Sequence, residues 1–203
     1  FAERAVRFRR HYTSGNRTAR ALFGMFYGLH GTYWPAFREA EKPPVLMDVL
    51  RAQGYQLGLY NSAKFTYPEF DRTIFSGVPP EMLHDDHTGL SWERDRKNVD
   101  DLIRFMDQRD PERPFMAFLF FDSTHSRYYF PPESALRKPY LEDVNYVTMD
   151  LERDGELLKN RYINSCHYMD TQIGRVLAYL EEHDLLDSTI VVIVGDHGEE
   201  FDE

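Results

Sequence analysis

Thr189-Ile190-Val191-Val192-Ile193-Val194, followed by Gly195-Asp196-His197-Gly198-Glu199-Glu200, is the stretch that decides the fold. The apolar run 189–194 predicts a buried parallel β-strand. An Asp-His pair directly after such a strand lies at the carboxyl edge of an α/β sheet, where ligands and metals bind. The Asp196 carboxylate and the His197 imidazole together suit Zn²⁺ or Mn²⁺. On its own the pair is equally explained by Asp196 capping a turn and His197 being a polar surface residue.

Further helix-strand steps precede this stretch. Pro43-Pro44 opens a predicted helix over 45–53, Gly54 ends it, and a strand follows at 55–60. The spacing also predicts a helix over 98–108 and a fully apolar strand over 115–121. This order predicts the α/β class, as a three-layer α/β/α sandwich with a mostly parallel central sheet.

The longest predicted helix covers 155–182 and leads into the 189–194 run. Apolar residues recur along it at spacings of three and four, which is typical of a helix packed on a sheet. The predicted stripe consists of Leu158, Tyr162, Cys166, Met169, Ile173, Val176 and Leu180.

The rest of the chain is predicted from weaker signals. Residues 1–12 have the pattern of a helix end, 13–17 that of a turn, and 18–28 that of a compact apolar helix. Residues 61–96 are polar and rich in Pro and Gly, so we expect a surface excursion. Residues 122–153 are a long aromatic loop, and loops of that length are usually functional or disordered.

Composition narrows the class of protein. The chain has 203 residues, 42% hydrophobic and 29% charged, which suits one globular domain over 1–203. Its net charge of −10 argues against a nucleic-acid partner, and the arginines from Arg4 to Arg10 are interpreted as a solvated helix face. Cys166 is the single cysteine, so no internal disulfide forms, and we expect an inert core thiol. Since the chain begins with Phe1 and stops in an acidic run, we expect a piece of a longer protein.

Two other segments carry candidate functional residues. Thr18 opens a predicted helix, where free N–H groups and the positive end of the helix dipole favour an alkoxide and bind oxyanions, although most such residues only cap a helix. His125 follows the 115–121 strand and could bind a metal or an oxyanion, or be a polar surface residue. A third cluster, His84-Asp85-Asp86-His87, is interpreted as a solvated loop.

These motifs together resemble a known family. Residues 188–200 resemble the Asp-His-Gly signature of the alkaline phosphatase/sulfatase superfamily. Residues 16–28 resemble the nucleophile helix of membrane-anchored phosphoethanolamine transferases and lipoteichoic acid synthases. Gly24-Met25-Phe26-Tyr27-Gly28 and Gly54-Tyr55-Gln56-Leu57-Gly58-Leu59 are similar to bacterial inner-membrane sulfatase-like proteins with a periplasmic catalytic domain.

The resemblance implies a role for each candidate residue. Thr18 matches the nucleophile, which also contacts the metal, and Asp196 and His197 match ligands of the first metal. His125 matches a histidine that binds a second metal or the substrate's oxyanion, and Asn16 is expected to contact substrate. We expect a divalent metal, zinc first, with manganese and calcium as alternatives. The family's upstream acidic ligand, its downstream histidine, the first strand and the C-terminal part of the domain are absent from this chain, so the sandwich is partial.

The resemblance also implies an activity. We expect a metal-dependent hydrolase or transferase that cleaves a phospho- or sulfo-ester through a threonine nucleophile. Sulfatases of this fold use a formylglycine made from Cys or Ser, which Thr18 cannot form, so phosphoester chemistry is favoured. The alternatives are a catalytically inactive lipid-binding regulatory domain and a true sulfuric ester hydrolase. We expect a small-molecule or lipid head-group substrate, and a periplasmic location in a protein held in the inner membrane by segments outside this chain.

Overall fold

A computed structural model describes residues 2–201, and its centre is a three-stranded parallel sheet in the order β2-β1-β3. The central strand β1 (Gln56–Asn61) pairs along its whole length with β3 (Phe115–Phe120). The other neighbour, β2 (Leu83–His84), pairs only with Leu59 and Tyr60. The two long strands were predicted within one residue at each end, because a helix-ending glycine and continuous apolar runs mark them.

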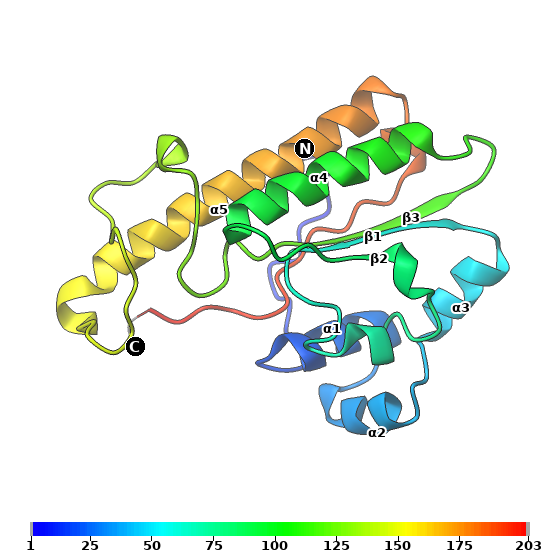
Figure 1. Cartoon of the computed structure of the whole chain (residues 1–203), viewed down its shortest axis with the longest axis horizontal. Coiled ribbons are helices and arrows are strands. Elements are labelled where there is room, and N and C mark those ends of the chain that lie inside the picture. The colour runs from blue at the N-terminus through cyan, green and yellow to red at the C-terminus, as the bar shows by residue number, and fades with distance from the viewer. Residues whose placement is uncertain (1, 202–203) are drawn as a thin grey trace.

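Helices cover both faces of the sheet (Figure 1). One face carries α4 (Ser91–Gln108) and α5 (Leu151–Glu182), and the other carries α1 (Thr18–Tyr27) and α3 (Val45–Ala52), with α2 (Trp34–Glu39) outside them. Short 3-10 helices lie at Ala2–Arg4, Gly31–Tyr33, Phe70–Arg72, Pro80–Met82, Pro132–Ser134 and Leu186–Ser188. The predicted three-layer α/β/α arrangement is confirmed.

Alternation along β1 divides the core in two. Leu57 and Leu59 pack with α1 and α3, whereas Tyr60 packs with α4 and α5. Gly58 faces α4, and a Cβ there would lie 2.7 Å from Cδ1 of Phe105. Glycine therefore lets α4 approach the sheet closely at this position.

The segment between β1 and β2 was expected on the surface, and that expectation is wrong. Residues 62–79, which we call the core loop, bury a set of large side chains under the sheet: Phe65, Phe70, Ile74, Phe75 and Val78. Phe75 packs against Phe118 of β3, with ring centroids 5.1 Å apart. The segment has no helical or strand periodicity, but its apolar content still leads it into the core.

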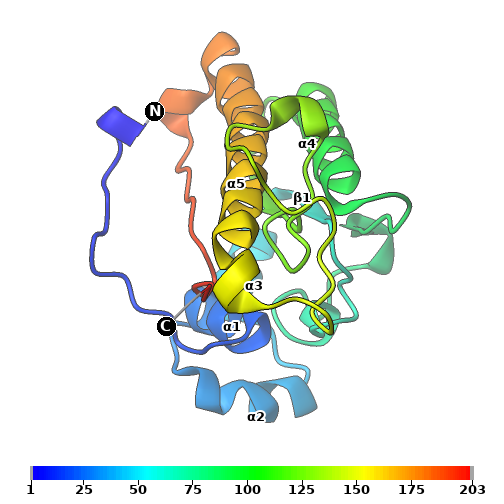
Figure 2. The ribbon, with the colours of Figure 1, turned by 90° about the vertical axis from the view of Figure 1, so that its left-hand side faces the viewer.

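The run 189–194 was predicted as a buried strand, and the structure contradicts this. Within the described residues it has no strand partner, and Ile190 and Val192 are 92% and 74% exposed. It runs as an extended segment beside α5 (Figures 1 and 2). A strand needs a neighbouring strand whose backbone forms hydrogen bonds with its N–H and C=O groups, and strand propensity alone does not provide one. None of the three strands of this sheet pairs with residues 189–194.

The helix predicted over 1–12 is also wrong, apart from the short turn at Ala2–Arg4. Val6 and Phe8 are 83% and 80% exposed, because no surface lies opposite them to bury an apolar helix face. The nearby arginines are solvated as expected, and Arg4 Nη2 lies 3.1 Å from Glu181 Oε1. Phe1 lies outside the described residues.

Helix α5 is confirmed but begins at Leu151, where the Asp150 side chain accepts hydrogen bonds from the first N–H groups. Of the predicted apolar stripe, Leu158 and Leu180 are buried and Cys166 is only half-buried. The remaining buried positions are mostly polar: Asp154, Arg161, Asn164, Ser165 and Gln172, with Tyr168. Several of these side chains hold the backbone of the preceding loop, a use of a helix face that apolar spacing does not reveal. None of the helices in residues 2–201 is long and apolar enough to cross a membrane.

Candidate functional site

The first part of the site is the turn that opens α1. Ser14 Oγ donates to the carbonyl of Arg20 at 2.7 Å and folds the turn onto the helix. A Cβ on Gly24 would lie 2.0 Å from Ser14 Oγ, so only glycine fits there. Thr18 is the first helical residue and is half-buried, while Asn16 is exposed. Arg17 at the N-cap provides no side-chain hydrogen bond, so the first N–H groups are free of side-chain caps and suit an oxyanion beside Thr18.

The second part is the Asp196-His197 pair. Asp196 Oδ2 lies 3.6 Å from His197 Nε2, is buried, and has no hydrogen-bond partner among residues 2–201. His197 Nδ1 lies 2.8 Å from the carbonyl of Gly198, and because a carbonyl only accepts, Nδ1 carries the proton. The Nε2 lone pair is then available next to an unsatisfied carboxylate oxygen. This donor set fits a divalent cation such as Zn²⁺.

A hydrogen bond joins these two parts. Thr13 Oγ1 lies 2.6 Å from the carbonyl of Asp196 and 2.7 Å from that of Gly15, in the turn before Thr18. Asp196 is therefore tied to the turn that positions Thr18. Thr18 shares no hydrogen bond with Asp196 or His197 in the described residues, and their meeting at a shared cation stays a prediction.

Within residues 2–201 no group of three or more His, Cys, Asp or Glu side chains could hold a metal. Asp196 and His197 alone supply two donors, fewer than such a group, and their role as metal ligands stays a prediction. The His84–His87 cluster has a structural use instead, since Asp85 Oδ2 accepts the N–H of Phe65 at 2.8 Å and lies in the loop that supports the core. The cluster was interpreted as a solvated loop, but His84 ends strand β2, and Asp85 and Asp86 are half-buried.

The third part is the turn after β3 that carries His125. His125 N donates to the carbonyl of Asp122 at 3.1 Å, and Tyr128 N donates to the carbonyl of His125 at 2.9 Å. The His125 side chain is exposed, as a substrate-binding role requires. Arg94 Nη2 lies 2.7 Å from Asp122 Oδ2, and burial raises the pKa of Asp122 while Arg94 and His125 oppose that shift.

The long loop beyond His125 is bonded to α5. The buried Arg161 donates from Nε to the carbonyl of Arg127 at 2.6 Å and from Nη1 to that of Leu141 at 2.7 Å. Burial lowers the pKa of the Arg161 guanidinium. The ring of Phe201 lies 5.8 Å from that of Tyr128, so the chain after His197 passes beside this same loop.

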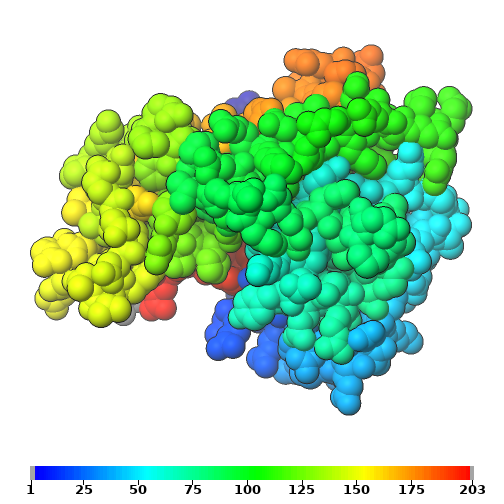
Figure 3. Space-filling view, viewed as in Figure 1, coloured from blue at the N-terminus to red at the C-terminus, as the bar shows by residue number. Residues whose placement is uncertain are grey.

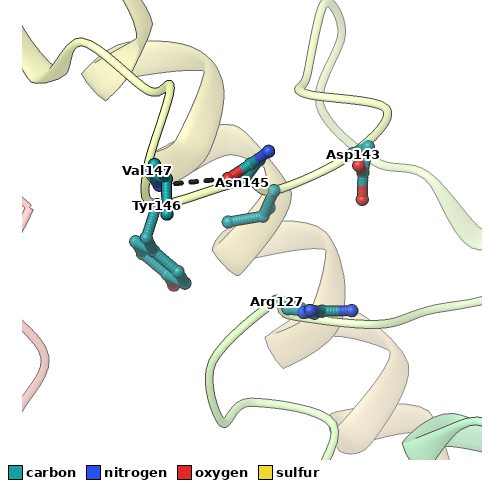
Figure 4. Close-up of a pocket in the computed structure, with 6 residues that line it drawn as sticks. Arg127, Asp143, Asn145, Tyr146 and Val147 are labelled. Carbon is teal, nitrogen blue, oxygen red and sulfur yellow. Dashed lines mark hydrogen bonds between the residues drawn. The ribbon is translucent and has the colours of Figure 1, made fainter.

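A cavity of about 350 Å³ opens in the long loop (Figure 4), lined by Arg127, Asp143, Val144, Asn145, Tyr146 and Val147. Arg127 and Tyr128 have φ values of 77° and 48°, a left-handed conformation that is rare for such residues. In Figure 3 the surface is hollowed between this loop and the core loop, and atoms from both ends of the chain are visible there.

Sequence reasoning proposed Thr18, His125 and the Asp196-His197 pair as site residues, but it missed the residues that contact the turns carrying them. Thr13 looked like one more polar turn residue. Arg94 and Asp95 lie within Glu93-Arg94-Asp95-Arg96-Lys97, a charged run typical of a solvated helix face, yet Asp95 is 0% exposed. A buried ion in a charged run leaves no signal in hydrophobic periodicity.

Comparison with known proteins places this geometry in context. The family described as Sulfatase matches residues 1–203. The inner membrane protein YejM of Salmonella typhimurium is 28% identical over 201 residues, covering 98% of this chain and 29% of its own length. An uncharacterized protein of Haemophilus influenzae is 25% identical over 203 residues, or 100% of this chain and 28% of its own length. An arylsulfatase of Clostridium perfringens is 30% identical over 122 residues, which cover 50% of this chain and 25% of the relative. The chain thus spans less than a third of the length of each of these relatives.

Proposed function

The chain belongs to the sulfatase family, and on that premise we propose that it is part of a metal-dependent enzyme that cleaves a phosphoester through Thr18. The single observation that carries this proposal is the tie between Thr13 and Asp196, at 2.6 Å. It brings the family's Asp-His pair to the turn that opens α1, where Thr18 lies.

In the proposed reaction, Thr18 Oγ attacks phosphorus, the bond between phosphorus and the leaving oxygen breaks, and the hydroxyl proton passes to solvent water. The free N–H groups at the start of α1 stabilise the negative oxygens, and His125 orients them from the opposite loop. Asp196 and His197 would hold a divalent cation, zinc first, which lowers the pKa of hydroxyl groups and offsets charge on leaving oxygens. Water or an acceptor alcohol then breaks the Oγ–P bond and restores Thr18; the acceptor distinguishes hydrolase from transferase.

Phosphoester chemistry is preferred to sulfoester chemistry because of the nucleophile. A threonine cannot be converted to the formylglycine aldehyde that sulfatases of this fold use, whereas its hydroxyl can form a phosphothreonine. The inner-membrane relative supports a link to the inner membrane, and we propose that the domain lies on its periplasmic side, held there by segments beyond this chain. We propose a small-molecule or lipid head-group ester as substrate.

The test uses the intact protein and bis(4-nitrophenyl) phosphate, with Zn²⁺, Mn²⁺ or Ca²⁺ added in turn after chelation. We expect turnover to vanish with chelator and to return with one of these metals. Thr18→Ala should lower kcat at least about a thousandfold, and Thr18→Ser should retain part of the activity. Thr171→Ala is the matched control, because Thr171 is exposed on α5 and should leave turnover unchanged.

Three results would contradict the proposal. Normal turnover by Thr18→Ala removes the nucleophile. Cleavage of 4-nitrocatechol sulfate in place of the phosphodiester would indicate a sulfuric ester hydrolase. Neither activity, with no bound metal, would favour the inactive lipid-binding domain.

A further inference from the structure

The turn that carries His125 is bonded to a buried carboxylate on α4. Asp95 is 0% exposed, and its two oxygens accept hydrogen bonds from consecutive backbone groups, Asp122 N to Oδ1 and Ser123 N to Oδ2, each at 2.9 Å. These N–H groups lie two and three residues after the end of β3 at Phe120. Charge-assisted bonds of this kind are stronger than those between neutral groups, and their low-dielectric surroundings strengthen them further.

The neighbouring Arg94 connects the same turn to β1. Its guanidinium donates from Nε to the carbonyl of Ser62, from Nη1 to that of Gly89 and from Nη2 to Asp122 Oδ2, each at 2.7 Å. Asn98, one helical turn along, donates from Nδ2 to Ser62 Oγ at 2.9 Å. One face of α4 thus holds the carboxyl ends of β1 and β3 together.

Burying an ionisable group costs free energy unless hydrogen bonds or ion pairs offset the loss of hydration. The hydrogen bonds of a buried Asp therefore indicate a structural role. Burial raises the pKa of Asp95, and the hydroxyl groups of Ser123 and Ser62 lower it. The Ser123 hydroxyl nonetheless has no hydrogen bond of ordinary geometry in residues 2–201, so the two backbone N–H groups are the firm partners. The Asp95 carboxylate therefore fixes the backbone of the turn that carries His125.

We propose that Asp95, assisted by Arg94, is a positioning residue for the candidate site: it sets the turn 122–125 and so the place of His125 relative to Thr18. This inference rests on the proposed function, in which His125 orients the substrate's oxygens. Displacement of a group that orients substrate lowers the rate steeply even when the displaced residue lies far from the bond that breaks.

The experiment compares Asp95→Asn with Asp107→Asn in the intact protein. Both changes remove one negative charge from α4, but Asp107 is exposed. The amide of Asn offers one acceptor where two N–H groups need two. In Asp95→Asn we expect hydrogen exchange of the amides in the peptide 121–128 to speed up about tenfold, equivalent to one lost hydrogen bond, with no change in Asp107→Asn. We also expect kcat/KM for the phosphodiester to fall about 10- to 100-fold, mostly in kcat.

A double-mutant cycle separates positioning from a general loss of structure. If Asp95 acts through His125, then adding Asp95→Asn to His125→Ala lowers kcat/KM by less than twofold, whereas independent effects multiply. Multiplied effects, or unchanged exchange in 121–128, would overturn the proposal. If Asp95→Asn does not fold, Arg94→Lys replaces it in the double-mutant cycle with His125→Ala. Lysine keeps the positive charge but cannot make the three contacts of the guanidinium. The same two outcomes, multiplied effects or unchanged exchange in 121–128, would then overturn the proposal.

Failure of this inference differs from failure of the proposed function. If the unmodified protein cleaves no phosphodiester, the function fails, and the exchange measurement alone then decides whether Asp95 holds the turn. If Thr18→Ala abolishes turnover while Asp95→Asn changes neither exchange nor rate, the function stands and the positioning role is wrong.

Discussion

The core loop and the run 189–194 are opposites in sequence and in structure. The core loop, 62–79, has no periodic pattern, yet Phe75 and Ile74 are 0% and 1% exposed. The run 189–194 has a strong strand pattern, yet Ile190 is 92% exposed. Apolar content measures the tendency to leave water, whereas regular secondary structure also requires a backbone partner. The core loop is buried although it forms almost no regular secondary structure. The run 189–194 has strand propensity but finds no backbone partner in the described residues, and it is exposed.

The largest expected effect comes from truncating the centre of the core loop. Phe75→Ala should lower the free energy of unfolding by about 3–5 kcal/mol, because the ring packs against Phe26, Phe65 and Phe118 and leaves a cavity. Ile190→Ala, the control in the run, should change it by less than about 0.5 kcal/mol. Chemical denaturation followed by tryptophan fluorescence measures both. A larger loss for Ile190→Ala would reverse the comparison.

A smaller effect is expected from removing one hydroxyl group in each region. Thr73 is 1% exposed and donates from Oγ1 to the carbonyl of Glu69 at 2.7 Å. Thr73→Val keeps the shape but leaves that carbonyl with only the N–H of Arg72, at 3.3 Å, so we expect a loss of about 1–2 kcal/mol. Thr189 donates to Leu185 at 2.7 Å but is only half-buried, and water can replace its hydroxyl in Thr189→Val. Equal losses in the two variants, measured by the same denaturation, would show that the two regions are equally buried.

The start of the core loop should also respond to pH through Asp95, which lies beside Ser62. Burial raises the pKa of Asp95 above the value of about 3.9 expected in an unfolded chain. The native state therefore binds this proton more tightly, and its contribution to stability is fully present below pH about 3.9 and is lost as pH rises through the native pKa. Asp95→Asn lacks this titration. Relative to Asp95→Asn, the unmodified protein should lose stability on going upward through this window, and a constant difference between the two would contradict the assigned shift.

The fold was largely predictable because its strands and helix ends have local signals. Gly54 and Gly28 end α3 and α1 with φ values of 73° and 65°, as the C-terminal glycine pattern predicts. The segment from Asp122 to Ser126 was correctly predicted to follow a strand. The roles of Thr18, His125, Asn16, Asp196 and His197 remain predictions, although the Thr13 contact places Asp196 at the turn before Thr18.

What could not be predicted depends on contacts between distant segments. Asp95 and Asp122 are separated by 27 residues, and Thr13 and Asp196 by 183. The buried face of α5 is polar because Arg161 and Asn164 hold loop backbone, and Asn164 Oδ1 accepts the N–H of Arg137 at 2.7 Å. Such pairings leave no periodic trace, and the same lack of a local signal hides the burial of the core loop.

The most direct test of the comparison makes the same substitution in both regions. Val192 is 74% exposed and Val78 is 7% exposed. Val→Thr exchanges a methyl group for a hydroxyl of nearly equal size, so it reports burial rather than shape. Val192→Thr should change the free energy of unfolding by less than about 0.5 kcal/mol, whereas Val78→Thr should cost about 1–3 kcal/mol. A loss of the Val78 magnitude at Val192 would mean that the run 189–194 is buried, as its sequence pattern predicts, and the contrast between the two regions would be wrong.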